Sequence, residues 1–133
     1  MSVIRFGVSL EKDYLDSLDD FVRQNQLSNR SQAIRHLINR NLVKNKWASN
    51  DMVAGSITLV YDHHKHNLSS KLTEIQHHYH QLILSLQHFH LDKDLCMEII
   101  AVKGNALIIT ELADKLIAVK GIGHGQITMT LAE

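Results

Sequence analysis

The stretch from His88 to Cys96, which reads His-Phe-His-Leu-Asp-Lys-Asp-Leu-Cys, constrains the fold more than any other part of the chain. His88 and His90 stand two residues apart, so both rings lie on one face of a strand. If Asp92-Lys93-Asp94 is the loop of a tight hairpin, His90 lies opposite Cys96 and His88 lies opposite Glu98. The Cβ atoms of directly opposed residues are about 4.5–5.5 Å apart. The sequence therefore predicts a hairpin on which two imidazoles, a thiol and a carboxylate converge.

Such a group of side chains predicts a metal site, and a closed site needs a fourth ligand besides His88, His90 and Cys96. The run Gln-His-His-Tyr-His at residues 76–80 offers one. His77 is about 200° around the helix from Ile75, so it points away from the apolar stripe. We therefore expect His77 to meet the hairpin of another subunit, which makes the site shared.

Residue types leave the identity of the metal open. Three histidines and one cysteine suit Zn(II) in a tetrahedron, and they also suit Ni(II) or Cu(II) in a square plane. Polar groups behind the ligands orient the imidazoles and tune the thiolate. Glu98 is the first candidate for that role, followed by Tyr61 and His63.

Charge and histidine are unevenly distributed along the 133 residues. Residues 1–50 hold eight Lys or Arg against five Asp or Glu, whereas nine of the ten histidines follow residue 50. This asymmetry indicates a basic N-terminal module joined to a separate sensing module. The single cysteine cannot form an internal disulfide, which favours a cytoplasmic setting. No apolar run is long enough to span a membrane, so we expect no membrane partner.

The N-terminal module, residues 1–47, begins with an alternating pattern over Val3–Leu10 that predicts a half-buried strand. Two amphipathic helices follow, and Asn29 with Gln32 forms a capping-box signature at the start of the second. A lone strand needs a partner, and a second copy of the chain would supply one as an antiparallel ribbon with Arg5 and Ser9 on its outer face. This plan resembles the ribbon-helix-helix repressors, whose ribbon enters the major groove.

After a linker at residues 48–55, the module 56–133 reads strand, helix, strand, strand, helix, strand. The predicted ranges are 56–61, 67–82, 83–91, 95–102, 105–120 and 125–131. This βαββαβ order predicts a ferredoxin-like domain of the ACT type, with helices on one side of a four-stranded antiparallel sheet. The opposite face is left free for oligomerisation. The expected fold class is thus α+β, with a ribbon-helix-helix domain and an ACT-like domain.

Over nearly its whole length the chain resembles NikR, the family of nickel-responsive transcriptional repressors. The matching tracts are Ile4–Leu10 (IRFGVSL), Asn29–Arg35 (NRSQAIR), Gln76–His80 (QHHYH), the set His88, His90 and Cys96, and Val119–Gly125 (VKGIGHG).

The resemblance implies a homotetramer, a dimer of dimers, in which a central ACT-like core is flanked by two DNA-binding dimers. It implies one square-planar Ni(II) per subunit, bound by His88, His90 and Cys96 of one subunit and His77 of another. It also implies that Tyr61–His80 becomes ordered on metal binding. The implied DNA contacts are Arg5, Gly7 and Ser9 to bases, Asn29, Arg30 and Ser31 to phosphate, and Lys65 near the duplex.

The expected function is repression of nickel-uptake genes, with nickel promoting binding to a palindromic double-stranded operator. Two departures from the family stand out: Gly7 offers no side chain to the bases, and Gln32 and His36 replace acidic residues that help some members hold potassium. The alternatives are a metal-handling or storage protein, and a regulator answering to zinc or copper. Four protein ligands close the site to water, so we expect no enzyme.

Overall fold

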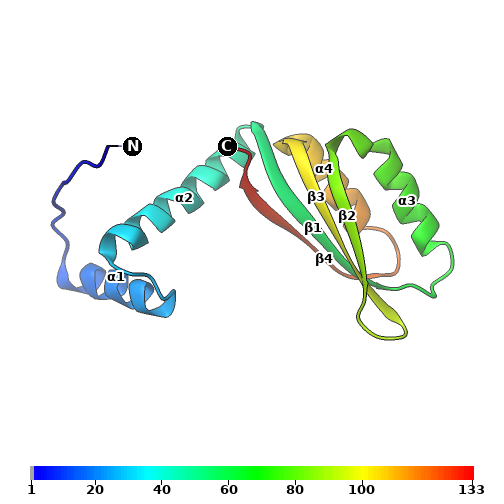
Figure 1. The fold of residues 1–133 in the computed structure, drawn as a ribbon, viewed down its shortest axis with the longest axis horizontal. Helices are drawn as coiled ribbons and strands as arrows, with labels where there is room; N and C mark the ends of the chain where they lie inside the picture. The colour runs from blue at the N-terminus through cyan, green and yellow to red at the C-terminus, as the bar shows by residue number, and fades with distance from the viewer. Residues whose placement is uncertain (1) are drawn as a thin grey trace. The chain divides into compact units, whose positions relative to one another are not determined.

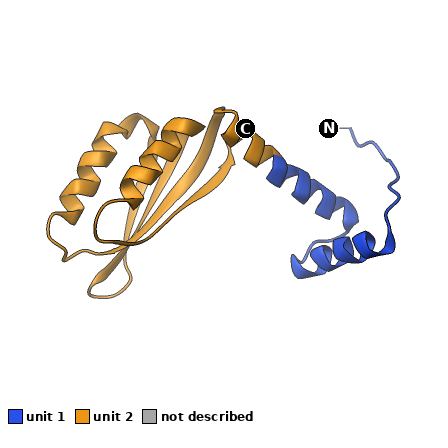
Figure 2. Cartoon of the chain, turned by 180° about the vertical axis from the view of Figure 1, so that it is seen from behind, with its two compact units in different colours: residues 1–41 blue, residues 42–133 orange. Residues whose placement is uncertain are grey.

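The computed structural model describes residues 2–133, which form helices and a single four-stranded sheet (Figure 1). Two compact units comprise residues 1–41 and residues 42–133 (Figure 2). The elements are α1 (Lys12–Gln24), α2 (Arg30–Ala48), β1 (Met52–Asp62), α3 (Leu68–His78), the 3-10 helix η1 (His80–Leu82), β2 (Ile83–His90), β3 (Leu95–Asn105), α4 (Ala106–Ile117) and β4 (Ile122–Leu131). No helix within residues 2–133 has the length and apolar character needed to cross a bilayer.

The predicted helix pair is present: α1 and the larger part of α2 lie in the N-terminal unit. The cap that separates its helices forms as the sequence indicates: Oδ1 of Asn29 accepts a hydrogen bond from the backbone N–H of Gln32 at 2.9 Å. The Gln32 side chain reaches back to the N–H of Ser28 at 2.6 Å, one residue earlier than in the usual capping box. These bonds satisfy backbone donors that would otherwise lack partners at the start of α2.

Residues 3–10, predicted as a strand, form no strand within the single chain. Their apolar side chains are largely exposed, with Ile4 at 85% and Phe6 at 72% of full exposure. The predicted strand, which pairs with the same segment of a second copy, therefore stays a prediction. The physical reason is that a strand is defined by its ladder of hydrogen bonds, and no neighbouring segment of residues 2–133 pairs with this one.

The C-terminal unit has the predicted ferredoxin-like plan, with antiparallel strands in the order β2-β3-β1-β4. Both α3 and α4 cover the same face of the sheet, as Figures 1 and 2 show. Alternate residues of the central strands point into the core beneath these helices because side chains alternate along a strand. The fully buried strand residues include Ile57, Leu59 and Ile100, and Ile109 and Leu112 of α4 belong to the same core.

Strand β1 begins at Met52, inside the range that the sequence analysis assigned to a linker. Small residues obscured the pattern there, but Gly55 pairs with Val102 on one side and Met129 on the other. Trp47 packs over this position, and its indole N–H donates to the carbonyl of Thr130 at 3.0 Å. The sheet therefore extends further toward α2 than hydrophobic alternation indicates.

We predict that Gly55→Ala destabilises the C-terminal unit. A Cβ at this position would lie 2.5 Å from the carbonyl oxygen of Thr128 and 3.2 Å from the Trp47 ring. Because the carbonyl belongs to a paired strand, relief requires a backbone shift that costs about 1–3 kcal/mol. Urea unfolding at fixed chain concentration measures the loss. Gly123→Ala is the matched control, since its Cβ would meet only the Val60 carbonyl at 3.4 Å; equal stability of the two variants would contradict this account.

Candidate metal centre

The β2–β3 hairpin has the predicted register, with His90 opposite Cys96 and His88 opposite Glu98. Its turn is held by Asp92, whose Oδ1 accepts hydrogen bonds from the backbone N–H groups of Asp94 at 2.8 Å and Leu95 at 2.7 Å. These bonds lower the pKa of the Asp92 carboxyl. The local sequence thus fixes which side chains oppose one another across the hairpin.

Cys96, His88 and His90 lie together on the helix-covered side of the sheet. The Cys96 sulfur is 3.4 Å from Nδ1 of His90, and the cysteine is fully buried. The rings of His88 and His90 are stacked with centroids 6.0 Å apart. The three residues predicted as ligands from one chain are therefore neighbours, with the sulfur beneath and the two exposed imidazoles on the edge strand.

Burial is the main cause that raises the pKa of the Cys96 thiol, and the nearby carboxylates of Asp62, Glu98 and Asp92 raise it further. The thiol is therefore protonated at neutral pH in the metal-free chain. A thiol next to imidazoles forms a donor set for borderline and soft transition metals, and a bound cation would offset the cost of the thiolate charge. The residues present thus fit a transition-metal ion.

A buried carboxylate lies directly behind His88. Glu98 is only 5% exposed, and its two oxygens accept hydrogen bonds from the Tyr61 hydroxyl and from Nε2 of Gln76, both at 3.2 Å. The Tyr61 oxygen is also 3.3 Å from Nε2 of His88. Because the hydroxyl gives its one proton to Glu98, Nε2 of His88 is the donor, which leaves the lone pair on Nδ1.

Burial and the charge of Glu98 raise the pKa of Tyr61, so its hydroxyl stays protonated as this chain of hydrogen bonds requires. Sequence reasoning missed Gln76. The signal that could have found it is its position four residues after Leu72 and eight after Leu68, on the buried stripe of α3.

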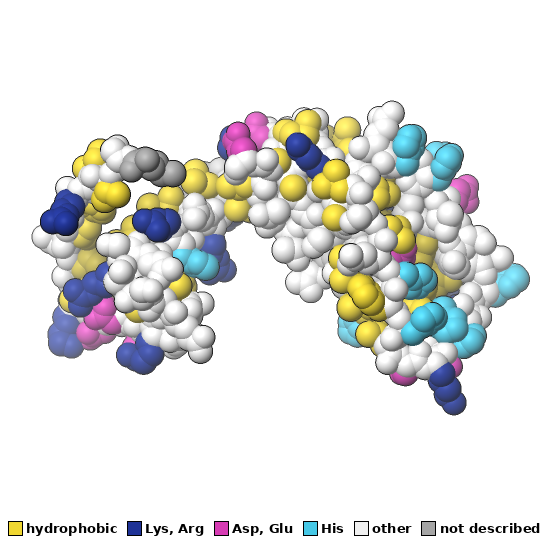
Figure 3. Space-filling view, in the orientation of Figure 1, with side chains coloured by type: hydrophobic (Ala, Val, Ile, Leu, Met, Phe, Trp, Pro, Cys, Tyr) yellow, Lys and Arg dark blue, Asp and Glu magenta, His cyan; other side chains and the backbone are white. Residues whose placement is uncertain are grey.

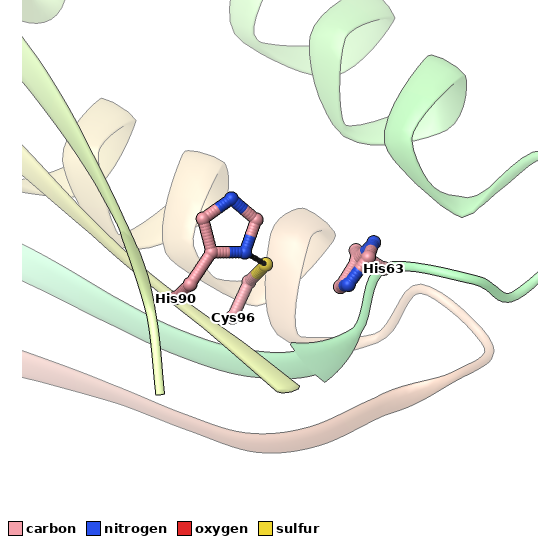
Figure 4. Close-up of side chains that lie close together, drawn as sticks. All are labelled: His63, His90 and Cys96. Carbon is pink, nitrogen blue, oxygen red and sulfur yellow. Dashed lines mark hydrogen bonds between the residues drawn. The ribbon is translucent and has the colours of Figure 1, made fainter. Parts of the chain in front are cut away.

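His63 approaches the pair more closely than the sequence analysis expected. One donor atom from each of His63, His90 and Cys96 lies within 4.8 Å of the other two (Figure 4). The predicted position of His63 is behind the ligands, whereas in the structure its ring centroid lies 5.4 Å from that of His90. The backbone explains this position, because the N–H of His63 donates to the carbonyl of Asp94 at 3.1 Å and ties the start of the β1–α3 loop to the hairpin.

His77 lies apart from this group of donors. It is exposed on α3, where its nearest aromatic neighbours are His80, with ring centroids 5.9 Å apart, and His78, at 6.4 Å. Gln76 points toward the sheet, and the next residue along a helix is rotated by about 100°. His77 therefore faces away from the hairpin of its own chain. Figure 3 shows the abundance of histidine on this unit.

The residues predicted to contact DNA are all exposed. Arg5, Gly7 and Ser9 lie in the unpaired segment 3–10, and Ser31 lies in the first turn of α2. Arg30 forms two hydrogen bonds with the carboxylate of Asp19, at 2.8 and 3.0 Å, which lower the pKa of that carboxyl.

The oxygen of Asn29 is already used by the α2 cap. Lys65 lies in the β1–α3 loop, where its methylene chain packs over Gly121. Gly121 has a φ of 108°, a conformation that favours glycine.

Comparison with known proteins gives a consistent result. Residues 54–130 match the family model described as the NikR C-terminal nickel-binding domain. A protein of Syntrophus aciditrophicus named "Putative nickel-responsive regulator" is 46% identical over 96% of this chain and 93% of its own length. Proteins of the same name from Desulfovibrio desulfuricans and Geobacter sulfurreducens are 48% and 47% identical, over 97% and 96% of this chain and 94% and 92% of their own lengths.

A solved structure supports the fold alone. An uncharacterized protein from Thermotoga maritima superposes with a TM-score of 0.54 at 15% identity, covering 59% of this chain and 98% of its own.

We predict that nickel affinity rises with pH, because the raised pKa of Cys96 means that metal binding must displace its proton. Release of one proton from the thiol gives a gain of about tenfold per pH unit near pH 7–8. Calorimetric titration with Ni(II) in buffers of different ionisation enthalpy counts the protons released. Binding that is independent of pH over this range would show that the thiol is already ionised in the free chain.

Proposed function

The chain belongs to the family of nickel-responsive regulators, with a C-terminal nickel-binding domain, and from this premise we propose that it is a cytoplasmic repressor of nickel-uptake genes. In this proposal its nickel-loaded form binds a palindromic operator. The observation that carries the proposal is the buried thiol of Cys96 beside two imidazoles on one hairpin, within a chain whose N-terminal unit exposes an unpaired segment, residues 3–10, that carries Arg5.

The proposed site holds one nickel ion per subunit through His88, His90 and Cys96, with His77 of the partner subunit as the fourth donor. The exposed position of His77, turned away from its own hairpin, supports this division. Bound nickel would supply a link between subunits that neither chain makes alone. Glu98 and Tyr61 orient the ring of His88 from behind, as groups behind metal ligands generally do.

Gln76 supports a coupling between the metal site and α3. Its side chain donates to Glu98, which lies opposite His88, and the next residue on the helix is His77. Any shift of α3 therefore disturbs both the group behind one ligand and the position of another. We propose that this coupling makes α3 and the preceding loop respond to the metal.

Residues 1–47 are proposed to form a ribbon-helix-helix domain. The segment 3–10 carries exposed apolar side chains beside an apolar groove of the same unit, which is lined by residues such as Phe6, Val8, Tyr14, Phe21 and Leu37. Pairing with the same segment of a second chain would bury these side chains and satisfy the strand's backbone. It would also leave Arg5, Gly7 and Ser9 on the outer face, toward the major groove.

The proposed assembly is a dimer of dimers built around the ACT-like units. Thr58, Val60, Met97 and Ile99 alternate with buried core residues along β1 and β3, so they lie on the sheet face away from α3 and α4. Nickel can favour DNA binding only if it binds more tightly to the arrangement of subunits that fits both half-sites.

Arg5→Ala should weaken nickel-dependent operator binding by at least about fivefold, since one good base contact contributes about 1–3 kcal/mol. The operator is first selected from random duplexes with nickel-loaded wild type, and affinity is then measured by mobility shift with Ni(II) or chelator. Arg23→Ala is the matched control, because Arg23 is an exposed cation of α1 paired with Asp20. Unchanged binding by Arg5→Ala, or equal binding with chelator present, would favour a metal-storage role.

Mixing two inactive variants tests the shared site. His77→Ala and Cys96→Ala should each lack tight nickel binding alone. In a mixed pair, one of the two sites regains all four donors, so random exchange of subunits restores about a quarter of the sites in a two-fold symmetric assembly. Near-ultraviolet thiolate-to-nickel absorbance after refolding the mixture measures the recovery. No recovery, with both variants folded, would place all four ligands on one chain.

A further inference from the structure

We propose that the groove between α3 and α4 binds a small organic anion with an apolar body, and that this anion and nickel each favour binding of the other. The groove contains none of the proposed metal ligands. The coupling to nickel rests on the proposed function, because it uses the response of α3 to the metal, whereas the anion site itself does not.

The groove follows the line where the two helices lie side by side (Figures 1 and 2). Its apolar floor is formed by Ile75 of α3 and by Ala118 and Val119, which directly follow α4. Ile75 and Val119 are half-buried and pack against the core, which holds the floor in place. The volume is about 560 Å³, within the range of about 300–1,000 Å³ that is typical of small-molecule sites.

Positive charge surrounds this apolar floor. Lys71, Lys115 and Lys120 line the groove together with a single carboxylate, that of Glu74. The three lysines are exposed, and no ion pair within residues 2–133 involves any of them. Ammonium groups without carboxylate partners, next to an apolar floor, are complementary to a molecule with a carboxylate or phosphate head and an apolar body.

Tyr79 extends the apolar surface of this site. The groove continues into a neighbouring hollow that is lined by Ile75, His78, Tyr79 and Lys115. The Lys115 nitrogen lies over the Tyr79 ring, 5.4 Å from its centroid, and cation–π attraction of this kind helps to hold an ammonium in place. An aromatic anion fits best, because its ring can pack against the apolar side chains while its charge meets Lys115.

Neither of the proposed contacts between subunits uses the groove. His77, the residue proposed to meet the partner subunit, is about 200° around α3 from Ile75. The sheet face proposed for oligomerisation is the face away from both helices. A ligand can therefore reach the groove in the proposed assembly.

Gln76 connects the groove to the metal centre. It follows Ile75 on α3, and its side chain donates to Glu98, which lies opposite His88. A ligand that contacts both α3 and α4 favours the arrangement in which α3 is packed in place. Nickel is proposed to favour the same arrangement, so each ligand raises the affinity for the other by the same factor.

The probe for the site is 8-anilinonaphthalene-1-sulfonate, an aromatic anion whose fluorescence rises in apolar surroundings. It is titrated into the full metal-free chain. The double variant Lys71→Gln/Lys115→Gln should bind the dye at least about fivefold more weakly, because two charge contacts are lost. Lys44→Gln/Lys103→Gln is the matched control, since it removes the same charge from exposed positions outside the groove. Its dye affinity should equal that of the wild type.

A second variant tests the floor without changing the charge. Ala118→Phe places a ring at an exposed position in the groove and should also weaken dye binding at least about fivefold. The exposed apolar segment 3–10 is the same in every variant, so differences between variants report on the groove. Inorganic phosphate should not displace the dye at equal concentration, because it lacks an apolar body. Far-ultraviolet circular dichroism checks that each variant is folded.

Repeating the wild-type titration with Ni(II) measures the coupling. Because coupling is reciprocal, the dye should bind at least about fivefold more tightly to the nickel-loaded chain. Equal dye affinity in the wild type and in both groove variants would overturn the anion site, and displacement by phosphate would overturn its apolar part. Dye binding that depends on the groove but is unchanged by Ni(II) would overturn the coupling.

Operator binding by the wild type is measured in parallel, without dye. If nickel promotes operator binding while the groove variants leave dye affinity unchanged, the anion site fails and the proposed function stands. If the groove variants weaken dye binding to the metal-free chain as expected but nickel does not promote operator binding, the proposed function fails and the anion site stands.

Discussion

The register of the β2–β3 hairpin is the constraint on which the metal centre depends. A slip of one residue would turn His88 and His90 to the opposite face of the sheet, away from Cys96. The turn bonds of Asp92 oppose such a slip at one end. Pairing of β3 with β1 on its other side opposes it along the strand, with Tyr61 beside Cys96 and Leu59 beside Glu98. Backbone hydrogen bonds thus fix the backbone positions of the donor residues, whatever the rotation of their side chains.

The hydrogen bonds of Glu98 couple this site to α3. A buried carboxylate is costly unless its oxygens are hydrogen bonded, so Glu98 stabilises the fold only while Tyr61 and Gln76 remain in place. Tyr61 extends the chain of hydrogen bonds to His88, and Gln76 extends it to the helix that carries His77. Few other arrangements of these side chains would keep every buried polar group hydrogen bonded. The network therefore holds α3 and the ring of His88 in one arrangement together.

Local patterns in the sequence predicted much of this arrangement. The His-X-His spacing and the Asp-Lys-Asp turn gave the hairpin register, and the Asn29 cap separated the two N-terminal helices correctly. Strand and helix periodicity gave the order of the C-terminal elements and hence the sheet. These features depend on neighbours within a few residues, where spacing and geometry are directly linked.

Features set by long-range contacts were predicted less well. The start of β1 at Met52 depends on Trp47 and on strands far along the chain, so its Ala-Gly sequence looked like a linker. The approach of His63 to Cys96 depends on a backbone bond to Asp94, which no spacing in the sequence reveals. The segment 3–10 illustrates the same limit, because its predicted strand requires a partner outside the single chain.

The ion pair between Arg30 and Asp19 bears on how selective the proposed DNA contact is. In the free chain both carboxylate oxygens of Asp19 accept hydrogen bonds from the guanidinium of Arg30, the group that is proposed to contact phosphate. Exposed ion pairs add little to stability, so a well-placed phosphate can displace the carboxylate. A poorly placed phosphate must compete with the Asp19 carboxylate for Arg30. The release of condensed counterions from the DNA then adds less to the net free energy of binding. Asp19 would therefore weaken nonspecific binding to DNA more than binding in which the proposed ribbon also contacts the bases. Such a preference is what a repressor needs to find its operator.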